Sequence, residues 1–518
     1  MLGLRLACVL AAAGLSACAA TPPGVTEPAP SAAVVIESPA GTPRPPFAFS
    51  PEDAALLESV QRGCFNFFWN AAHPTTGMVP DRSTHPMVSV AGVGFQLSAI
   101  IVGAERGWVT RAQAEQRTLL ILRTLDAHPE NRRFGMFFHF LDASTGGQPD
   151  TPYEHVASTI DTALFLAGAI TSSTYFGGEV KAIADRLIEE CDWKAFAFGD
   201  DAPAFERGMI RLAWEPDDIK KPLGPGKFTN YGWIDAGDEH RLVTFLAVMS
   251  PRAEHRIDPA AYYRLRRALG QYENTGPLVY FPWSGALFTS FFAHCWMDYR
   301  AMGVDDPMAL GVINRPRVDW WENARRTTLL HRIKSAKNPW KITDKSEHEW
   351  GLSASDAPPT KAGEKATYAV PGFFPDPIAD AKLRRDIDIA VARPPAGRDQ
   401  IGDGTFAPYT AGSTIMFDPQ PAIAAMRYYK ELKNPDGTPR MWSDPASGGY
   451  GFRDSINRRK NWVAEDYVAI DQGPLILAIE NARTGLLWRL FHEHPFVRAG
   501  VERLKFPPVQ AGVQATHR

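Results

Sequence analysis

The sequence predicts an all-helical protein, built as a toroid whose long loops form a cleft at one end. Three observations lead to this prediction: helical periodicity recurs along the chain, alternating strand patterns are scarce, and long connections separate several helices. These connections are rich in Gly, Pro, Trp, Tyr and Asp, and loops of such length in compact proteins are usually functional. A solenoid of stacked helices is the alternative, but the sequence has no repeat of fixed period.

Helix-start signals mark the beginnings of several predicted helices. Ser50-Pro51, Asp258-Pro259 and Asp418-Pro419 each place a capping side chain before a proline, and Thr110 is followed by Gln113 at the capping-box spacing. Helical periodicity follows each signal. Similar periodicity predicts further helices over residues 91–105, 157–176, 178–191, 239–249, 286–300, 319–335 and 473–491, with long connections at 129–156, 192–238, 338–417 and 434–472.

The N-terminus has the composition of an export signal. Arg5 precedes an apolar run from Leu6 to Leu15, which is too short to cross a bilayer. The end of this run, Leu15-Ser16-Ala17-Cys18, resembles a bacterial lipobox, so we expect residues 1–17 to be a lipoprotein signal peptide and Cys18 to be acylated. An ordinary secretory signal is the alternative. The expected location is the bacterial cell envelope, as a periplasm-facing lipoprotein with the outer membrane favoured, attached to the membrane through the lipid anchor only.

Two further segments follow the signal. Residues 18–47 are rich in Pro, Ala, Thr and Ser and nearly devoid of large apolar side chains, so they are expected to form a disordered tether. Residues 48–510 contain no other low-complexity stretch and carry aromatic residues throughout. They are expected to form a single large helical domain.

Composition excludes several classes of function. The net charge of −3 gives no electrostatic basis for binding nucleic acid. The sequence has no zinc-protease, serine-hydrolase, phosphate-loop, dinucleotide or EF-hand motif, so neither a metal nor a cofactor is expected. Cys64, Cys191 and Cys295 fall within apolar helical patterns and are expected to be small buried residues rather than disulfides or zinc ligands. The protein is expected to be a monomer.

The long loops combine aromatic side chains with carboxylates, which is the chemistry of carbohydrate sites. Trp350 and Asp356 enclose a small polar segment, Asp403 is followed by Gly404-Thr405, and Tyr450 lies between glycines. Flat aromatic rings stack on sugar rings, whereas carboxylates bind hydroxyl groups or transfer protons. These loops therefore predict an oligo- or polysaccharide ligand.

Carboxylates at predicted helix starts are candidates for proton transfer. Asp471 precedes an apolar helix whose N-terminus would keep its pKa low, as suits a base. Asp161 and Glu239 begin strongly apolar helices, where burial would raise the pKa, as suits a general acid. For all of these carboxylates, a plain helix-start role is the alternative. His294 and Asp298 share one face of the predicted helix 286–300, and a structural pair is favoured over a metal site.

An ordered set of motifs resembles the glucoamylase-like family that contains the bacterial endo-β-1,2-glucanases of glycoside hydrolase family 144. The motifs follow the family's order: Ser158-Thr159-Ile160-Asp161-Thr162-Ala163-Leu164, Glu239 before Ser250-Pro251, His294-x-Trp-x-Asp-x-Arg300, Asp319-Trp320-Trp321-Glu322-Asn323, Trp350 to Asp356, Asp403-Gly404-Thr405, Tyr450-Gly451-Phe452, Ile470-Asp471-Gln472-Gly473-Pro474 and Glu480-Asn481-x-Arg-Thr-Gly485. The resemblance implies that residues 48–510 form an (α/α)6 catalytic barrel, and that the protein is an inverting glycoside hydrolase acting on β-1,2-linked glucan.

The resemblance also implies roles for individual residues. Glu239 matches the family's Glu expected to act as general acid, and Asp471 matches the Asp of Asp-Gln-Gly-Pro, the candidate base. The residues expected to bind substrate are Asp161, Glu154, Asp150, His294, Trp296, Arg300, Trp350, Asp356, Asp403, Tyr450 and Gln472.

The chain departs from the family pattern beside the expected cleft. Val156 stands where the family has Glu, Ala236-Gly237-Asp238 replaces Gly-Tyr-Asn/Ser, and Phe291 replaces Gln. These departures leave open the linkage, the chain length and the choice between endo and exo cleavage. They also keep two alternatives open: a glucan-binding lipoprotein without hydrolytic activity, and a β-1,2-glucan transglycosylase on the same scaffold.

Overall fold

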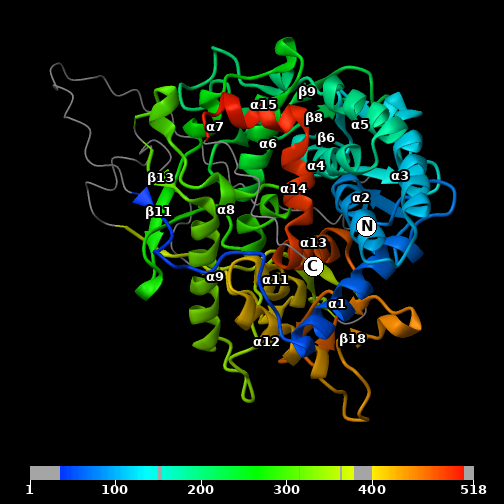
Figure 1. Cartoon of the computed structure of the whole chain (residues 1–518), viewed down its shortest axis with the longest axis vertical. Coiled ribbons are helices and arrows are strands. Elements are labelled where there is room, and N and C mark those ends of the chain that lie inside the picture. Colours follow the sequence, from blue (N-terminus) through cyan, green and yellow to red (C-terminus); the bar gives the residue numbers. More distant parts are fainter. Residues whose placement is uncertain (1–34, 150–154, 314, 362–363, 379–398, 507–518) are drawn as a thin grey trace, which may run out of the picture.

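The computed structural model describes residues 35–149, 155–313, 315–361, 364–378 and 399–506, which form the predominantly helical fold that the sequence predicts (Figure 1). The helices are α1 (Pro51–Asn70), α2 (Val90–Glu105), α3 (Arg111–Asp126), α4 (Thr159–Phe176), α5 (Gly178–Glu190), α6 (Asp238–Met249), α7 (Ala260–Arg264), α8 (Tyr299–Met302), α9 (Trp320–Ala336), α11 (Pro408–Ser413), α12 (Pro419–Glu431), α13 (Ala469–Thr484), α14 (Leu486–Glu493) and α15 (Pro495–Arg503). No helix within the described ranges is both long enough and apolar enough to span a bilayer.

The strands are short and pair in small ribbons rather than in one large sheet. They are β1 (Val35–Ile36), β2 (Met87–Ser89), β3 (Arg132–Arg133), β4 (Met136–Phe137), β5 (Phe140–Asp142), β6 (Ala157–Ser158), β7 (Ile210–Arg211), β8 (Ala213–Pro216), β9 (Gly226–Phe228), β10 (Gly232–Trp233), β11 (Ala268–Gln271), β12 (Leu278–Tyr280), β13 (Arg317–Val318), β14 (Ser355–Ala357), β15 (Thr367–Ala369), β16 (Asp376–Pro377), β17 (Thr405–Phe406), β18 (Trp442–Ser443), β19 (Gly451–Phe452), β20 (Ile456–Asn457) and β21 (Trp462–Val463).

An inner ring of helices is surrounded by outer helices, as expected for an (α/α)6 barrel. Helix α2 packs between α13 and α4, α4 packs against α6, and α13 packs against α11. The outer helices α1, α3, α5 and α12 pack on α13, α2, α4 and α11 respectively (Figure 1). Since α2 and α4 separate α6 from α13, residues at the starts of α6 and α13 are not neighbours within the ring.

The inner helices are surrounded by other elements on every side, and their side chains are therefore apolar on every face. Helices α2 and α4 are buried along most of their length, and glycines allow them to cross closely. A Cβ atom on Gly94 would lie 2.2 Å from the carbonyl oxygen of Leu164, and one on Gly168 would lie 2.0 Å from the carbonyl oxygen of Gly94. Any larger residue at either position would force the two helices apart.

The N-termini of the inner helices gather at one end of the barrel, together with the long connections. Ser89 caps α2, and Ser158 caps α4 by accepting a hydrogen bond from the Asp161 amide. The strands that lead into these helices, β2 and β6, pair with β5 and β8 in the long connections. A bridge between Arg82 and Val468 joins another loop to the start of α13. This end of the barrel is therefore where a cleft can form.

The predicted helix over residues 286–300 is wrong. The chain forms short 3₁₀ turns at Leu287–Ser290 and Ala293–Cys295, followed by the single turn α8. Two side chains explain the interruptions. The Asp238 carboxylate accepts a hydrogen bond from the Ala293 amide at 2.7 Å, and the Asp298 side chain accepts one from the Ala301 amide, which starts a new turn. The predicted helix over 473–491 is likewise divided, at Gly485, whose φ of 68° ends α13.

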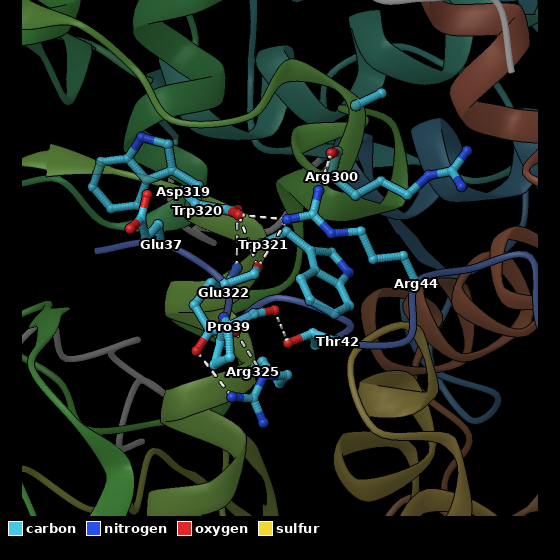
Figure 2. A network of polar contacts seen from close by, with 12 residues as sticks. Glu37, Pro39, Thr42, Arg44, Arg300, Asp319, Trp320, Trp321, Glu322 and Arg325 are labelled. Atoms are coloured by element: carbon cyan, nitrogen blue, oxygen red, sulfur yellow. Dashed lines mark hydrogen bonds and ion pairs between the residues drawn. The ribbon is translucent and has the colours of Figure 1, made fainter. Parts of the chain in front are cut away.

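The structure also differs from the predicted tether over residues 35–47, whereas residues 18–34 lie outside the described ranges. Strand β1 pairs in parallel with β13, and the Phe47 amide donates to the carbonyl oxygen of Ala482 at the end of α13. Figure 2 shows Arg44 reaching Asp319, to which it donates at 2.8 Å, with Trp321 beside it. The Arg44 guanidinium lies 5.2 Å from the Trp321 ring centroid. This segment thus packs at the end of the barrel opposite the long connections.

Candidate active site

Glu239 occupies the second position of α6 and is partly buried. Burial and the nearby charges of Asp161 and Asp238 raise the pKa of Glu239 to about 8. Among the described residues, none forms a hydrogen bond or ion pair with its carboxyl group. Glu239 is therefore protonated near neutral pH, and no described residue forms a hydrogen bond with its carboxyl group. The raised pKa confirms the prediction made from its place on an apolar helix.

Asp161 faces Glu239 from the start of α4. Its carboxylate accepts a hydrogen bond from Ser158 Oγ at 2.5 Å and lies 3.4 Å from His139 Nε2. On the other side, the charge of Asp161 acts on Asp81. Burial raises the pKa of Asp81, while Arg82 and His139 act to lower it. The structure thus brings three carboxyl groups close together: Asp81 from a loop, Asp161 from α4 and Glu239 from α6.

Asp471 lies in the first turn of α13, as predicted, but its environment is not the expected one. Burial and the neighbouring Asp454 raise the pKa of Asp471 well above its usual range, so the predicted low pKa is wrong. A helix N-terminus stabilises a carboxylate by about 0.3–1 kcal/mol when exposed. Burial beside a second carboxyl group raises the pKa of a carboxyl group by several units, which is a larger effect in the opposite direction.

A second carboxyl cluster surrounds Asp471. The Asp356 amide donates to Asp454 Oδ2 at 2.7 Å, which fixes Asp454 between Asp356 and Asp471. Burial and the charge of Asp454 raise the pKa of Asp356 to about 7. Tyr409 adjoins Asp471, yet neither Asp471 oxygen makes a hydrogen bond of good geometry with a described residue. Asp454 and Asp471 therefore behave as a pair that shares protons.

Aromatic side chains pack around His240, the residue that follows Glu239, and were not predicted from the sequence. His240 packs against Trp233 and Phe281, with ring centroids 4.5 Å and 4.7 Å away. Its Nδ1 lies 2.8 Å from the carbonyl oxygen of Asp235, and burial lowers the pKa of His240 to about 4, so the ring is neutral. The Asp235 carboxylate in turn accepts from Trp283 Nε1 at 2.9 Å. In the sequence, the aromatic residues of the loop near position 283 could have indicated these side chains as candidates for the site.

Several residues predicted to bind substrate are buried in the core instead. His294 is paired with Asp238, not with Asp298, and its Nε2 lies 3.2 Å from the Trp320 carbonyl oxygen. Trp296 is fully buried and donates to Ser98 Oγ at 2.9 Å. Trp350 is buried as well, beneath Tyr429, which donates to its carbonyl oxygen. These side chains are thus enclosed within the barrel.

Other predicted residues contact partners that belong to neither carboxyl cluster. Arg300 stacks on Trp488 and bonds to Asp298, at the opposite end of the barrel. Asp403 forms an ion pair with Lys460 at 2.8 Å in a rim loop. Tyr450 lines a hollow of about 440 Å³ with residues that include Arg453 and Tyr467.

Gln472 is buried and donates to the Phe452 carbonyl oxygen at 2.9 Å, so it holds the loop that carries Asp454. Glu154 and Asp150 lie outside the described residues. Of the predicted residues, the structure therefore brings together Asp161 with Glu239, and Asp356 with Asp471.

Comparison with known proteins finds a curated relative that matches most of this chain. The exo β-1,2-glucooligosaccharide sophorohydrolase (non-reducing end) of Parabacteroides distasonis is 25% identical over 489 residues, which cover 88% of this chain and 58% of that protein. The chain thus spans somewhat over half the length of this curated relative.

Two solved structures share the fold. The endo-β-1,2-glucanase from Chitinophaga pinensis, in complex with sophorotriose and glucose, matches with a TM-score of 0.67 and 24% identity, over 88% of this chain and 98% of that chain. The β-1,2-glucanase from Parabacteroides distasonis matches with a TM-score of 0.69 and 23% identity, over 88% of this chain and 60% of that chain. These likenesses confirm the predicted helical barrel.

The Glycoamylase family, described as "Putative glucoamylase", matches residues 230–495, which is just over half of the chain and includes Glu239 and Asp471. The chain belongs to this glucoamylase-like family.

Proposed function

We propose that this protein is an exported hydrolase of β-1,2-linked glucan that inverts configuration at the anomeric carbon. The observation that carries the proposal is Glu239: a partly buried carboxyl group with a pKa of about 8 and no described partner, at the end of the barrel where the loops gather. A protonated carboxyl group in such a place is suited to donate its proton to a glycosidic oxygen.

The second cluster supplies the base. Asp471 stands on α13, which α2 and α4 separate from α6. An inverting enzyme needs such a separation, roughly 6.5–9.5 Å between carboxyl groups, because a water molecule must fit between the sugar and the base. Glu239 protonates the leaving oxygen while water attacks the anomeric carbon from the opposite face. Asp471, sharing charge with Asp454, accepts the proton of that water.

The relatives support the choice of substrate. The curated relative is named for release of sophorose units from β-1,2-glucooligosaccharides, and one structural match is a β-1,2-glucanase bound to sophorotriose. Trp233, which packs against His240, and Trp283, which donates to Asp235, are half-buried and are proposed to provide flat faces for the glucose rings.

The test is incubation of the purified protein with linear and cyclic β-1,2-glucans, followed by measurement of new reducing ends and by NMR of the first anomer formed. Release of the α-anomer supports inversion. Disaccharide from linear chains alone indicates exo cleavage, whereas a ladder from both substrates indicates endo cleavage. Longer products would instead identify a transglycosylase, and calorimetric binding without cleavage a binding protein. Intact β-1,2-, β-1,3- and β-1,4-glucans would remove the hydrolase proposal.

Export and anchoring form a separate part of the proposal, supported by the lipobox-like Leu15-Ser16-Ala17-Cys18. Expressed in a bacterial host, the native chain should fractionate with membranes, and the Cys18→Ser variant should not. Equal fractionation of both chains would exclude the lipid anchor without affecting the proposed activity.

A further inference from the structure

The loop that carries Asp81 and Arg82 is fastened to the start of α13 through its backbone. The Ala469 amide donates to the Asp81 carbonyl oxygen at 2.8 Å, and the Ser83 amide donates to the Tyr467 carbonyl oxygen at 3.0 Å. Arg82 forms the antiparallel bridge with Val468 between these two bonds. The backbone therefore holds Arg82 beside the first turn of α13 independently of its side chain.

The Arg82 side chain lies between the two carboxyl clusters. Its Nε is 3.5 Å from Asp81 Oδ2, and its Nη1 donates to Asp356 Oδ1. The guanidinium group also lies 5.2 Å from the Tyr368 ring centroid, which limits its movement. With the side chain only 19% exposed, water screens this charge weakly.

Charged and titratable groups face Arg82 from every element around it. On the Asp81 side these are Asp161, His139 and His85, with Glu239 and the exposed Lys365 beyond them; on the Asp356 side they are Asp454, Asp466, Asp471, Tyr368 and Tyr409. So many carboxyl groups cannot all ionise within one buried region unless a positive charge lies among them.

We propose that Arg82 is a positioning residue. Its positive charge lies between Asp81 and Asp356 and allows the Asp454–Asp471 pair to ionise, although Arg82 does not contact that pair directly. Its catalytic consequence rests on the proposed function, since only a hydrolase needs Asp471 as a base. The electrostatic effect itself does not depend on any substrate.

The experiment measures ionisation directly, by NMR titration of the full chain with ¹³C-carboxyl-labelled aspartate. Signals of the pair are assigned with Asp454→Asn and Asp471→Asn. In Arg82→Gln the titration midpoint of the pair should rise by about 1–3 pH units, whereas Arg82→Lys should stay close to the native value. If the native chain hydrolyses glucan, the acidic limb of its kcat/KM profile should move in the same direction.

Arg106→Gln is the matched control. Arg106 bonds to the buried Glu480 at 2.6 Å with a side chain 17% exposed, but it follows α2 at the opposite end of the barrel. A merely structural role for Arg82 predicts lower stability in both variants and no change in midpoint. An unchanged midpoint in Arg82→Gln, or an equal shift in Arg106→Gln, would overturn the proposal.

A charge-neutral double variant keeps the test valid if Arg82→Gln does not fold. Asp356→Asn alone leaves the Arg82 charge without its strongest partner, so the midpoint of the pair should fall. Adding Arg82→Gln should return it toward the native value. If both variants show the same midpoint, Arg82 has no influence on the pair. A chain that cuts no glucan but shows these shifts would contradict the proposed function and support the role of Arg82.

Discussion

Asp238 and Glu239 are adjacent in the sequence, yet their carboxyl groups lie in opposite environments at the start of α6. Burial alone would raise the pKa of Asp238, but the charges of His294 and Arg241 outweigh it and lower that pKa below its usual range. Burial raises the pKa of Glu239 to about 8 without such compensation. The Asp238 carboxylate therefore has a structural role, whereas the neighbouring Glu239 can release and take up a proton.

The two residues should consequently respond differently to mutation. Glu239→Gln should reduce glucan hydrolysis roughly 10²- to 10⁴-fold without loss of stability, because glutamine keeps the shape and cannot donate the proton. Asp238→Ala should lower the free energy of unfolding by roughly 3–5 kcal/mol, because Arg241 would remain buried without its ion-pair partner. Reducing-end assays and urea unfolding measure the two effects. Comparable activity in Glu239→Gln and the native chain would exclude Glu239 as the acid.

Stability should depend on pH through Glu239. Its pKa in the folded chain is raised from the ordinary 4.5 to about 8. The protonated side chain therefore contributes its full stabilisation below pH 4.5, and this stabilisation is lost as the pH rises toward about 8. Glu239→Gln, which stays neutral, should therefore become progressively more stable than the native chain between these pH values. Urea unfolding of both chains at several pH values tests this. A difference that stays constant across that interval would contradict the raised pKa.

The charge of Asp161 should set the alkaline limit of activity. Asp161 raises the pKa of Glu239, so Asp161→Asn should lower it and move the alkaline limb of the kcat/KM profile down by about one pH unit. Asparagine can still accept the hydrogen bond from Ser158 Oγ, which preserves the local geometry. Asp403→Asn, in a rim loop paired with Lys460, serves as the control and should leave the limb in place. Identical limbs in both variants would show that Asp161 does not act on the acid.

Periodicity and capping signals predicted most of the helices, because an inner helix must be apolar and a helix start must satisfy its free amides. Ser50 before α1 and Thr110 before α3 are examples. The helix over 286–300 failed because Asp238, distant in sequence, binds the amides of Ala293 and His294. No local pattern contains that contact.

The site was predictable only where one residue carries the signal by itself. Glu239 was found because its helix is apolar, and Asp161 because it begins another such helix. The pKa of Asp471 was misjudged because Asp454, on a different loop, lies beside it. His294, Trp296 and Trp350 were predicted to line a cleft but are buried, because an aromatic or charged motif reads the same in the sequence whether it faces a cleft or a core. The burial of these side chains depends on tertiary packing, which no local pattern contains.

The contrast between Trp283 and Trp296 tests that distinction directly. Trp283 is half-buried and is fixed by its bond to Asp235, whereas Trp296 is fully buried and bonded to Ser98. Trp283→Ala should raise KM for β-1,2-glucan roughly 3- to 10-fold with little change in stability, because a stacking face is lost. Trp296→Phe should leave KM unchanged and lower the free energy of unfolding by about 1–3 kcal/mol, because it leaves a cavity and strands the Ser98 hydroxyl.

Trp283→Phe separates stacking from orientation, since it keeps a ring but cannot donate to Asp235. An intermediate KM is expected if both the ring and its hydrogen bond matter. Initial-rate kinetics on linear β-1,2-glucan and urea unfolding of the same preparations provide the measurements. A raised KM in Trp296→Phe at unchanged stability would instead place Trp296 against the substrate, as its sequence motif alone implied, and would contradict its position in the barrel core.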